Sequence, residues 1–448
     1  MISAKDFLAL RSGKNAHSVG EEVSLPAAGS ALEGSFLSAE QVRALRDEFG
    51  SPFYVYSEAF FLEQAKLVLE MPSAFGLTPR YAMKACPNIS IVKLLHDAGL
   101  KIDASSGFEA MRCLAIGIPG EDIQLTSQEL PVNIEELIAT GIQFNACSLN
   151  QLAMYGELFP GTSLSVRFNP GLGSGFSNRT NVGGPSSSFG IWHEYVSQVK
   201  EIADTHDLTV AAIHSHIGAG TDPEVWVRCA DLTLAIAAQL PDVQSVNMGG
   251  GFKAARMPGE ETADLQLIGN AVKEKFEAFK ENDPAGRELS MQIEPGTFLT
   301  AGAGAIISTI IDIKNTGSEG YDFLLVDTGM TEVLRPSIYG AQHPLYVVNS
   351  EARDVGSKEY LIAGHCCESG DILTPAAGDP EGLLPRSLNE AEVGDIVVVG
   401  GAGAYCSGMT TTNYNSFPKA AEVLLTTDGK AKVIRRREAA EEVYQLEK

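Results

Sequence analysis

The stretch PRYAMKACPNISIVKLLHDAGLKIDASSGFEAMRCLAIG, residues 79–117, contains two short apolar runs, and each is followed by an amphipathic segment. Apolar runs that alternate with helix-like segments predict a parallel sheet whose strands are joined by helices. The same alternation runs from about residue 52 to about residue 300. It gives about eight or nine β-α units over roughly 250 residues, which favours a (β/α)8 barrel over an open doubly wound sheet.

The pattern differs on either side of this region. After residue 300, strand-like runs such as YDFLLVDTG and DIVVVGG are separated by turns, which predicts a second, all-β domain. Near the start, LPAAGSALEGS has the composition of a loop, and SAEQVRALRDEFG predicts a helix with Ser38 as N-cap and Gly50 at its end. We expect an N-terminal arm and helix over residues 1–50 packed on the β domain, the barrel over 51–300, and the β domain over 301–448.

The composition limits the compartment and the partners. The chain has 448 residues and a formal net charge of −24, which argues against nucleic acid or an anionic membrane as a partner. Its seven cysteines lack the spacing of a disulfide framework or a zinc site, so reduced thiols are expected. The start, MISAKDFLAL, has no apolar signal-peptide core, and the longest apolar runs are too short to span a bilayer. We expect a soluble cytoplasmic protein.

Lys84 lies in the small-residue stretch RYAMKACPN, where an ammonium group is expensive to bury. One interpretation is a lysine at the end of a strand with its tip in solvent, and the other is a lysine used in chemistry. Several more polar residues and glycines lie at the ends of strand-like runs, the part of a (β/α)8 barrel that carries the active site. They are Lys84, Ser105, Arg167, His216, Gly249 and Glu294.

Two glycine turns follow consecutive strand-like runs, VNMGGGF at 246–252 and EPG at 294–296. Consecutive glycines allow the backbone to approach a ligand closely, and their N–H groups can bind a phosphate. A tight turn without a ligand is the alternative.

Two histidines alternate in IHSHIGAG, residues 213–220, so that His214 and His216 point to the same side of a strand. They could be metal ligands, but no HExxH or similar spacing supplies a third ligand, so no metal is predicted. Stacking on a flat cofactor is the functional interpretation for one of them. A hydrogen-bonded core histidine is the alternative for the other.

The predicted β domain carries further candidates. Arg335 and Tyr339 lie four residues apart in VDTGMTEVLRPSIYG, where an arginine could clamp a carboxylate or form a surface ion pair. HCCESGD, residues 365–371, places a thiol beside a carboxylate, which could supply a proton donor and a contact for an amine. That motif and GAGAYCSGM are ordinary loops when taken alone. Together, the lysine, the glycine turns, a stacking histidine and a strand-end carboxylate suit pyridoxal 5′-phosphate.

These motifs occur in a characteristic order: YAMKA, DASSGFE, VRFNPG, SSFGI, HSHIG, NMGGGF, EPGT, VDTGMTEVLRPSIYG, CCESGDIL, GDIVVVGGAGAY and NYNSFP. From about residue 50 to about residue 440, the chain resembles the barrel-type pyridoxal-phosphate-dependent decarboxylases of basic amino acids, which include ornithine and arginine decarboxylases. The resemblance implies an alanine-racemase-like fold, a (β/α)8 barrel followed by a β domain. It also implies a homodimer with shared active sites.

The resemblance assigns roles to residues of this chain. Lys84 would join the cofactor through a Schiff base, His216 would stack on its ring, and Glu294 would pair with its pyridine nitrogen. In the β domain, Cys367 would be the proton donor and Glu368 would bind the distal amine, both in the partner subunit's site. The phosphate would be surrounded by Gly249, Gly250, Gly251 and Gly296. Arg335 and Tyr339 would contact the substrate, and Tyr405 would lie close to both cofactor and substrate.

Three positions depart from the family pattern. Thr297 stands where the family has the arginine of EPGR, Ala219 replaces a serine, and Ser188 replaces a frequent lysine. Because that arginine contacts substrate in the family, its charge must be replaced or absent here. Arg167 or Arg179 could compensate.

The resemblance favours one substrate of the family over the others. RPSIYG and CESGDIL are closer to the branch of the family that converts meso-2,6-diaminopimelate to L-lysine. Because Thr297 differs, ornithine, lysine, arginine or carboxynorspermidine stays an alternative substrate. The CESGD motif disfavours an alanine-racemase-like isomerase. A catalytically inactive homologue that regulates by binding is disfavoured because Lys84, Glu294, Cys367 and the glycine loop are all present.

Overall fold

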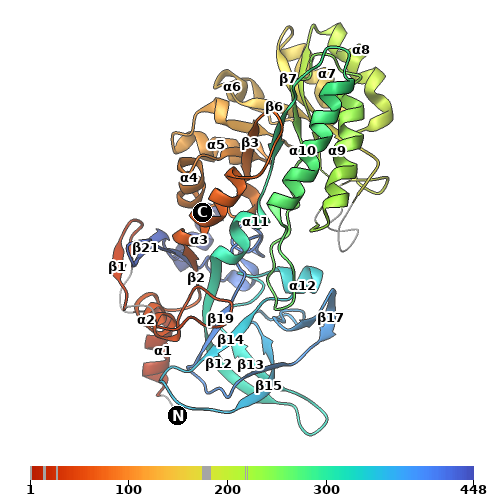
Figure 1. Cartoon of the computed structure of the whole chain (residues 1–448). Helices are drawn as coiled ribbons and strands as arrows, with labels where there is room; N and C mark the ends of the chain where they lie inside the picture. Colours follow the sequence, from red (N-terminus) through yellow and green to blue (C-terminus); the bar gives the residue numbers. More distant parts are fainter. Residues whose placement is uncertain are drawn as a thin grey trace. The chain divides into compact units, whose positions relative to one another are not determined.

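The computed structural model describes residues 3–13, 17–26, 29–173, 183–216, 218 and 220–447 (Figure 1). The chain forms two compact units. One contains Leu62–Ala254 and Glu261–Leu299 and is called the barrel below. The other contains Met1–Phe61, Ala255–Glu260 and Thr300–Lys448 and is called the β domain.

Parallel strands close the barrel, which confirms the predicted (β/α)8 architecture. Each strand pairs in parallel with the next along the chain, and the last pairs with the first. A short additional strand, β8 (Ile191–Trp192), pairs with β7. The barrel strands are β3 (Leu77–Ala82), β4 (Lys101–Ala104), β5 (Ile123–Leu125), β6 (Gln143–Ala146), β7 (Ser163–Asn169), β9 (Thr209–Ser215), β10 (Ser245–Asn247) and β11 (Ser290–Ile293).

Helices connect these strands and lie around them (Figure 1). Polar N-caps define where several begin, since a side-chain oxygen accepts an otherwise unpaired backbone N–H. Ser106 caps α5 and Asp264 caps α10 in this way. The helices between strands β3 and β11 are α4 (Ile89–Asp97), α5 (Gly107–Ala115), α6 (Ile134–Ala139), α7 (Leu149–Leu158), α8 (Val196–Thr205), α9 (Pro223–Ala237) and α10 (Leu265–Asn282), with 3-10 turns η1 (Met83–Ala85), η2 (Gly120–Asp122) and η3 (His193–Tyr195). Helix α3 (Glu58–Leu69) precedes β3, and α11 (Thr297–Thr300) and the turn η4 (Ala301–Ala303) follow β11.

Strand β2 (Phe53–Ser57) corrects the predicted start of the barrel. The alternation predicted that this run begins the barrel, but it pairs with β12 (Gly304–Asn315) and β20 (Ala421–Leu425) of the β domain. Four of its five residues are buried. A strand buried on both faces reads as a continuous apolar run in any sheet, so hydrophobicity could not assign it to one.

The β domain is built around a ten-stranded sheet with the order β1-β21-β20-β2-β12-β13-β15-β18, to which β19 and β14 are attached. It thus draws strands from both ends of the chain. The remaining elements are β1 (Glu22–Ser24), β13 (Asp322–Val326), β14 (Leu345–Val348), β15 (Ser357–Ala363), β18 (Arg386–Asn389), β19 (Ile396–Val399), β21 (Lys430–Arg435), the pair β16 (Pro375–Ala376) and β17 (Asp379–Leu383), helices α1 (Ala4–Ser12), α12 (Arg335–Tyr339) and α13 (Ala440–Val443), and turns η5 (Tyr414–Ser416) and η6 (Gln445–Glu447).

Helix α2 (Ala39–Phe49) begins and ends where the sequence predicts. Ser38 and Gln41 form a capping box, and the chain leaves the helix at Gly50, whose φ of 72° suits glycine. The apolar face of α2, with Leu45 and Phe49, lies in one core cluster with β2, β12 and β20. This burial anchors the N-terminal segment on the sheet.

In the described part of the chain, no helix combines the length and apolarity needed to cross a membrane. All seven cysteines lie in that part, and each is a free thiol there.

Candidate functional site

Lys84 lies on η1, the turn directly after β3, and its side chain is exposed. The turn places it at the carboxyl end of a barrel strand, where parallel barrels carry their sites. Its positive charge acts on the buried carboxyls of Asp103 and Glu294. The structure therefore combines the two interpretations of Lys84: the ammonium reaches solvent and also lies within the field of two buried acids.

Glu294 follows β11, and three polar side chains surround its buried carboxylate. Gln124 Nε2 and Asn247 Nδ2 donate to Oε1 at 3.0 and 2.6 Å. His214 Nε2 lies 3.3 Å from Oε2. The three partners come from β5, β10 and β9, so the barrel itself assembles this acceptor site.

The field around Glu294 favours its ionised form. Burial opposes ionisation, but His214 and Lys84 outweigh it and hold the pKa of Glu294 below its ordinary value. Burial lowers the pKa of His214. Asn145 Nδ2 donates to His214 Nδ1 at 2.7 Å, which leaves the proton of the neutral ring on Nε2, facing Glu294. His214 is thus a hydrogen-bonded core histidine that serves the carboxylate.

His216 directly follows β9, and burial lowers the pKa of its ring far below the usual range, with Arg167 and Lys84 adding to the effect. Its Nδ1 atom is buried and has no hydrogen-bond partner among the residues that the structure describes. An uncharged imidazole with an unused nitrogen at this place suits contact with a flat ligand.

The glycine loop packs closely against the same residues. Gly249 has a φ of +70°, and a Cβ atom there would lie 2.8 Å from His216 Cβ. At Gly250 a Cβ atom would lie 2.3 Å from the carbonyl oxygen of Glu294. Gly251 also has a positive φ, of 97°. The N–H of Gly249 donates to Asn247 Oδ1 at 2.8 Å. The N–H groups of Gly250 and Gly251 have no acceptor within the described residues.

Gly296 begins the turn after Glu294 and packs on the segment before Lys84. A Cβ atom at Gly296 would lie 3.2 Å from Ala85 Cβ. Ala82 N donates to the carbonyl of the preceding residue, Pro295, at 3.2 Å. Gly296 therefore lets the Glu294 turn and the Lys84 turn approach each other.

Four polar residues of this site escaped the sequence-based prediction. Besides Gln124, Asn145 and Asn247, Asp103 of β4 is buried, and its pKa is raised to about 7 by burial and by the charge of Glu294. Each is a buried polar residue that lies within a barrel strand, beside an apolar residue. That signal could have found them, because a buried polar side chain needs a partner.

Ser105 and Arg167, the other candidates at strand ends, contact Glu109 and Phe189 respectively. Ser105 N donates to Glu109 Oε2 at 2.7 Å and so helps to begin α5. Arg167 of β7 lies with its guanidinium 4.9 Å from the Phe189 ring centroid. Among the departures, Thr297 begins α11 and Ser188 is exposed. Ala219 and Arg179 lie outside the described residues.

In the β domain, α12 carries Arg335 at its start and Tyr339 at its end. Arg335 Nη1 donates to His343 Nε2 at 2.8 Å. Tyr405 adopts a left-handed backbone conformation with a φ of 57°, which is uncommon for a residue with a Cβ atom. The charge of Arg335 acts on the adjoining Cys406 thiol. Arg335 and the 405–406 turn therefore belong to one cluster.

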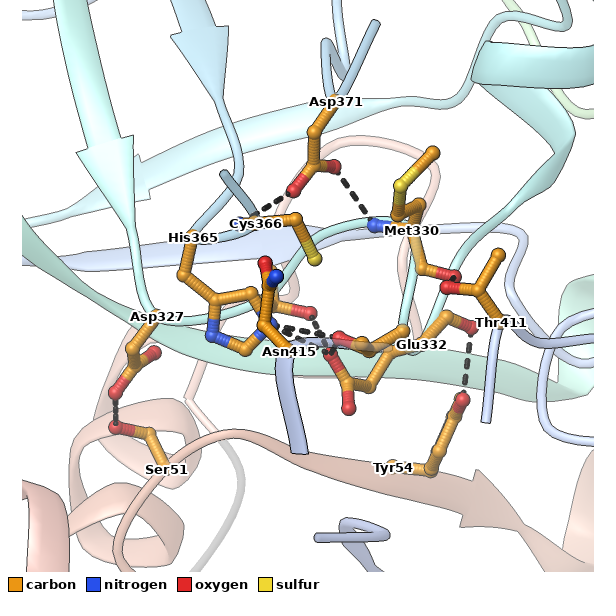
Figure 2. Close-up of polar contacts among 12 residues, drawn as sticks. Ser51, Tyr54, Asp327, Met330, Glu332, His365, Cys366, Asp371, Thr411 and Asn415 are labelled. Atoms are coloured by element: carbon orange, nitrogen blue, oxygen red, sulfur yellow. Dashed lines mark hydrogen bonds and ion pairs between the residues drawn. The ribbon is translucent and has the colours of Figure 1, made fainter. Parts of the chain in front are cut away.

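Cys367 and Glu368 have exposed side chains and lie on a loop whose backbone is hydrogen-bonded to other parts of the β domain. Cys367 N donates to Asn415 Oδ1 at 2.7 Å, and Glu368 Oε1 accepts from Gly370 N at 3.2 Å. Asp371 accepts from Cys366 N and from Met330 N at 2.9 and 2.7 Å, as Figure 2 shows. The loop therefore presents a thiol and a carboxylate on a fixed backbone.

A buried polar cluster supports the start of this loop (Figure 2). Thr331 Oγ1 lies 2.7 Å from both Glu332 Oε2 and His365 Nε2. The His365 ring stacks on Phe417 with centroids 3.7 Å apart. Tyr54 of β2 donates its hydroxyl to the Glu332 carbonyl at 2.7 Å, which ties the N-terminal strand to the cluster.

The donor set of the barrel fits pyridoxal phosphate. It offers an amine at Lys84, an ionised carboxylate at Glu294, an uncharged ring at His216 and unused backbone N–H groups at Gly250 and Gly251. These are the groups that bind an aldehyde, a pyridine nitrogen, an aromatic ring and a phosphate. In the described residues, no group of three or more His, Cys, Asp or Glu side chains could hold a metal ion.

A family model described as "Pyridoxal-dependent decarboxylase, pyridoxal binding domain" matches residues 63–301, the region that folds as the barrel. The chain belongs to this family. The predicted dependence on pyridoxal phosphate is thereby confirmed, and so is the enzyme class.

Members of this decarboxylase family match almost the whole chain. The diaminopimelate decarboxylases of Escherichia coli (strain K12) and Streptomyces coelicolor are both 33% identical; they align over 92% and 93% of this chain and 97% and 93% of their own. A crystal structure of a diaminopimelate decarboxylase superposes with a TM-score of 0.84 at 33% identity, over 92% of this chain and 97% of that one. The Helicobacter pylori enzyme complexed with L-lysine has a TM-score of 0.78 at 27% identity, over 90% and 98%.

Proposed function

We propose that this chain decarboxylates meso-2,6-diaminopimelate to L-lysine and CO2, a step of lysine biosynthesis. The observation that carries the decarboxylase chemistry is the buried, ionised Glu294 in the barrel that also presents Lys84. The substrate is supported by the relatives, which are diaminopimelate decarboxylases that align with this chain over nearly their full length.

Bound pyridoxal phosphate supplies the electron sink for the electron pair that remains on carbon when CO2 departs. The barrel residues would hold and tune it. Lys84 Nζ would form the covalent link, and the Gly250 and Gly251 N–H groups would bind the phosphate. The Glu294 carboxylate would pair with the pyridine nitrogen and keep a proton there, because His214 and Lys84 keep this carboxylate ionised.

Residues of the β domain would act on the substrate. Cys367 Sγ would return a proton to the carbon that lost CO2, and Glu368 would bind the distal ammonium group. Arg335 and Tyr339 would also contact the substrate, and Tyr405 would lie near the cofactor. We propose that the Cys367–Glu368 loop serves the site of a second copy, so that the enzyme is a homodimer, and that it works in the cytoplasm. The exposure of both side chains supports a role toward another subunit.

The test measures CO2 release from the purified enzyme loaded with pyridoxal phosphate. Substrates meso-2,6-diaminopimelate, L-ornithine, L-lysine and L-arginine are compared side by side, and the product is identified by chromatography. We expect release from diaminopimelate, with L-lysine as the product. Preferred turnover of another substrate would reject the assignment and favour a sister decarboxylase.

Lys84→Ala is the matched control for this assay. It should abolish turnover, and it should also remove the absorbance band of the lysine-bound cofactor, which reports binding independently of activity. Normal turnover in this variant would refute the role of Lys84.

A further inference from the structure

Arg256 belongs to the short segment Ala255–Glu260, which lies between two parts of the barrel sequence but is part of the β domain. Its stem packs on Gly401, where a Cβ atom would lie 3.1 Å from Arg256 Cγ. Arg256 Nε donates to the Gly401 carbonyl at 3.1 Å. The Nη2 atom is buried and has no hydrogen-bond partner among the described residues. A buried guanidinium nitrogen without an acceptor is costly, unless a ligand supplies one.

Arg335 provides a second positive charge in the same cluster. Its Nη1 donates to His343 Nε2 at 2.8 Å, and His343 Nδ1 donates to the Gly400 carbonyl at 2.8 Å. Since a guanidinium cannot accept and a carbonyl cannot donate, His343 is the neutral Nδ1–H tautomer. Burial and both arginines lower the pKa of His343 far below its usual range, so this residue does not add a charge.

The two guanidinium groups are close enough to repel. The pKa of Arg256 is lowered to about 9, first by burial and next by Arg335. Two adjacent like charges in a poorly solvated place are unfavourable unless an anion joins them.

Within the described residues, no carboxylate forms a salt bridge with either arginine, although the charge of Glu260 acts on both. The nearest candidate, Glu260, is exposed, and its Oε2 accepts from the backbone N–H groups of Arg256 and Met257 at 2.8 and 3.3 Å. Burial raises the pKa of the Cys406 thiol, which keeps it uncharged. The cluster therefore has two cations, a neutral histidine and a neutral thiol beside them, and a buried Arg256 Nη2 that lacks an acceptor among the described residues.

A carboxylate matches this arrangement because guanidinium groups bind its planar pair of oxygens in a bidentate manner. Decarboxylation converts the departing carboxylate into neutral CO2, so strong ion pairing there would stabilise the ground state more than the transition state. Two fixed cations suit instead the carboxylate that the product retains.

We propose that Arg256 and Arg335 together bind the retained carboxylate of the substrate, and that Arg256 supplies the charge that Thr297 lacks. This assignment rests on the proposed function. It predicts selection for amino acids with a second carboxylate over those, such as ornithine, that have an amine alone at that end.

The test is Arg256→Gln in the holoenzyme. Calorimetry compares binding of L-lysine, which keeps the carboxylate, with binding of cadaverine, which lacks it. We expect L-lysine binding to weaken about 10- to 100-fold and cadaverine binding to change less than about twofold, as for loss of one charge-assisted contact. For diaminopimelate, KM should rise by a similar factor while kcat changes less.

Arg256→Lys keeps the charge without the fork and should retain intermediate binding. Arg436→Gln is the control, because Arg436 is exposed and paired with Glu442. This substitution removes the same charge from the same domain and should leave the binding of L-lysine and cadaverine, KM and kcat unchanged. Equal L-lysine binding in Arg256→Gln and the unmodified enzyme would overturn the proposal. Failure of the unmodified enzyme to release CO2 from diaminopimelate would instead reject the proposed function. In that case, selective loss of L-lysine binding would still support the carboxylate site.

Discussion

At the scale of single residues, Glu332 shows how burial changes the chemistry of a carboxyl group. Its side chain is only 3% exposed, and the hydroxyls of Thr328 and Thr331 donate to Oε2 at 3.0 and 2.7 Å. Burial outweighs these donors and raises the pKa of Glu332 from 4.5 to about 7. The folded protein therefore holds a proton that the unfolded chain releases at lower pH.

A carboxyl whose pKa is raised on folding costs stability once it ionises, so stability is lost as pH rises from about 4.5 to about 7. Glu332→Gln stays neutral and can still accept from both threonines. At pH 8, we expect the free energy of unfolding of this variant to exceed that of the unmodified protein by on the order of 2 kcal/mol. Near pH 4.5, the two free energies should be equal.

Urea unfolding of both proteins at the two pH values measures this difference. Asp312→Asn, a change at an exposed carboxylate on β12, controls for the loss of one negative charge. A variant that is less stable than the parent at pH 8 would show that the ionised carboxylate stabilises the fold.

At the scale of elements, the loop from His365 to Asp371 depends on one carboxylate at its end. Asp371 accepts backbone N–H groups from Met330 and Cys366. Gly329 and Gly364 lie so close that a Cβ atom at either would come within 2.3 Å of Asp371. Asp371, at the end of this loop, thus ties the start of the loop at Cys366 to the separate segment at Met330. It acts as a positioning residue for Cys367 and Glu368.

Asp371→Asn keeps the size of the side chain but replaces one acceptor with an NH2 group that would face a backbone N–H. We expect a loss of about 1–3 kcal/mol in stability. With diaminopimelate, kcat should fall more than KM rises, because the proton donor would be misplaced while the carboxylate site of Arg335 is intact. Cofactor absorbance should not change. Unchanged kcat would show that the loop keeps its conformation without this clamp.

Strand β2 and helix α2 show which elements a local pattern can assign. The helix follows from Ser38, Gln41 and Gly50, whose effects act within a few residues. The strand was correctly recognised as a strand but placed in the wrong sheet. Its partners, β12 and β20, are about 250 and 370 residues away, and no periodicity within β2 encodes them.

At the scale of the whole molecule, the proposed sharing of sites between two copies can be tested by mixing subunits. Lys84→Ala and Cys367→Ala each remove one group of the proposed site, and each homodimer should have very low turnover. If the loop acts in the partner's site, a mixed dimer has one site with both groups intact. Random reassociation of equal amounts should then restore up to about a quarter of the parent activity.

The measurement is CO2 release after the two variants are unfolded and refolded together, with each variant refolded alone as the control. Cys367→Ala should still show the absorbance of bound cofactor. Activity of the mixture no higher than that of the separate variants would mean that both groups act within one chain.

Sequence alone determined the alternation of strands and helices, the glycine turns and the place of Lys84 and Glu294 at strand ends, because these patterns depend on neighbouring residues and on the geometry common to all parallel barrels. Only the tertiary structure decided the sheet to which β2 belongs, the partners that keep Glu294 ionised, and the meeting of Arg256 with Arg335. The physical reason is the same in each case. Burial, hydrogen bonding and charge repulsion depend on distances between residues far apart in the chain, and those distances exist only after folding.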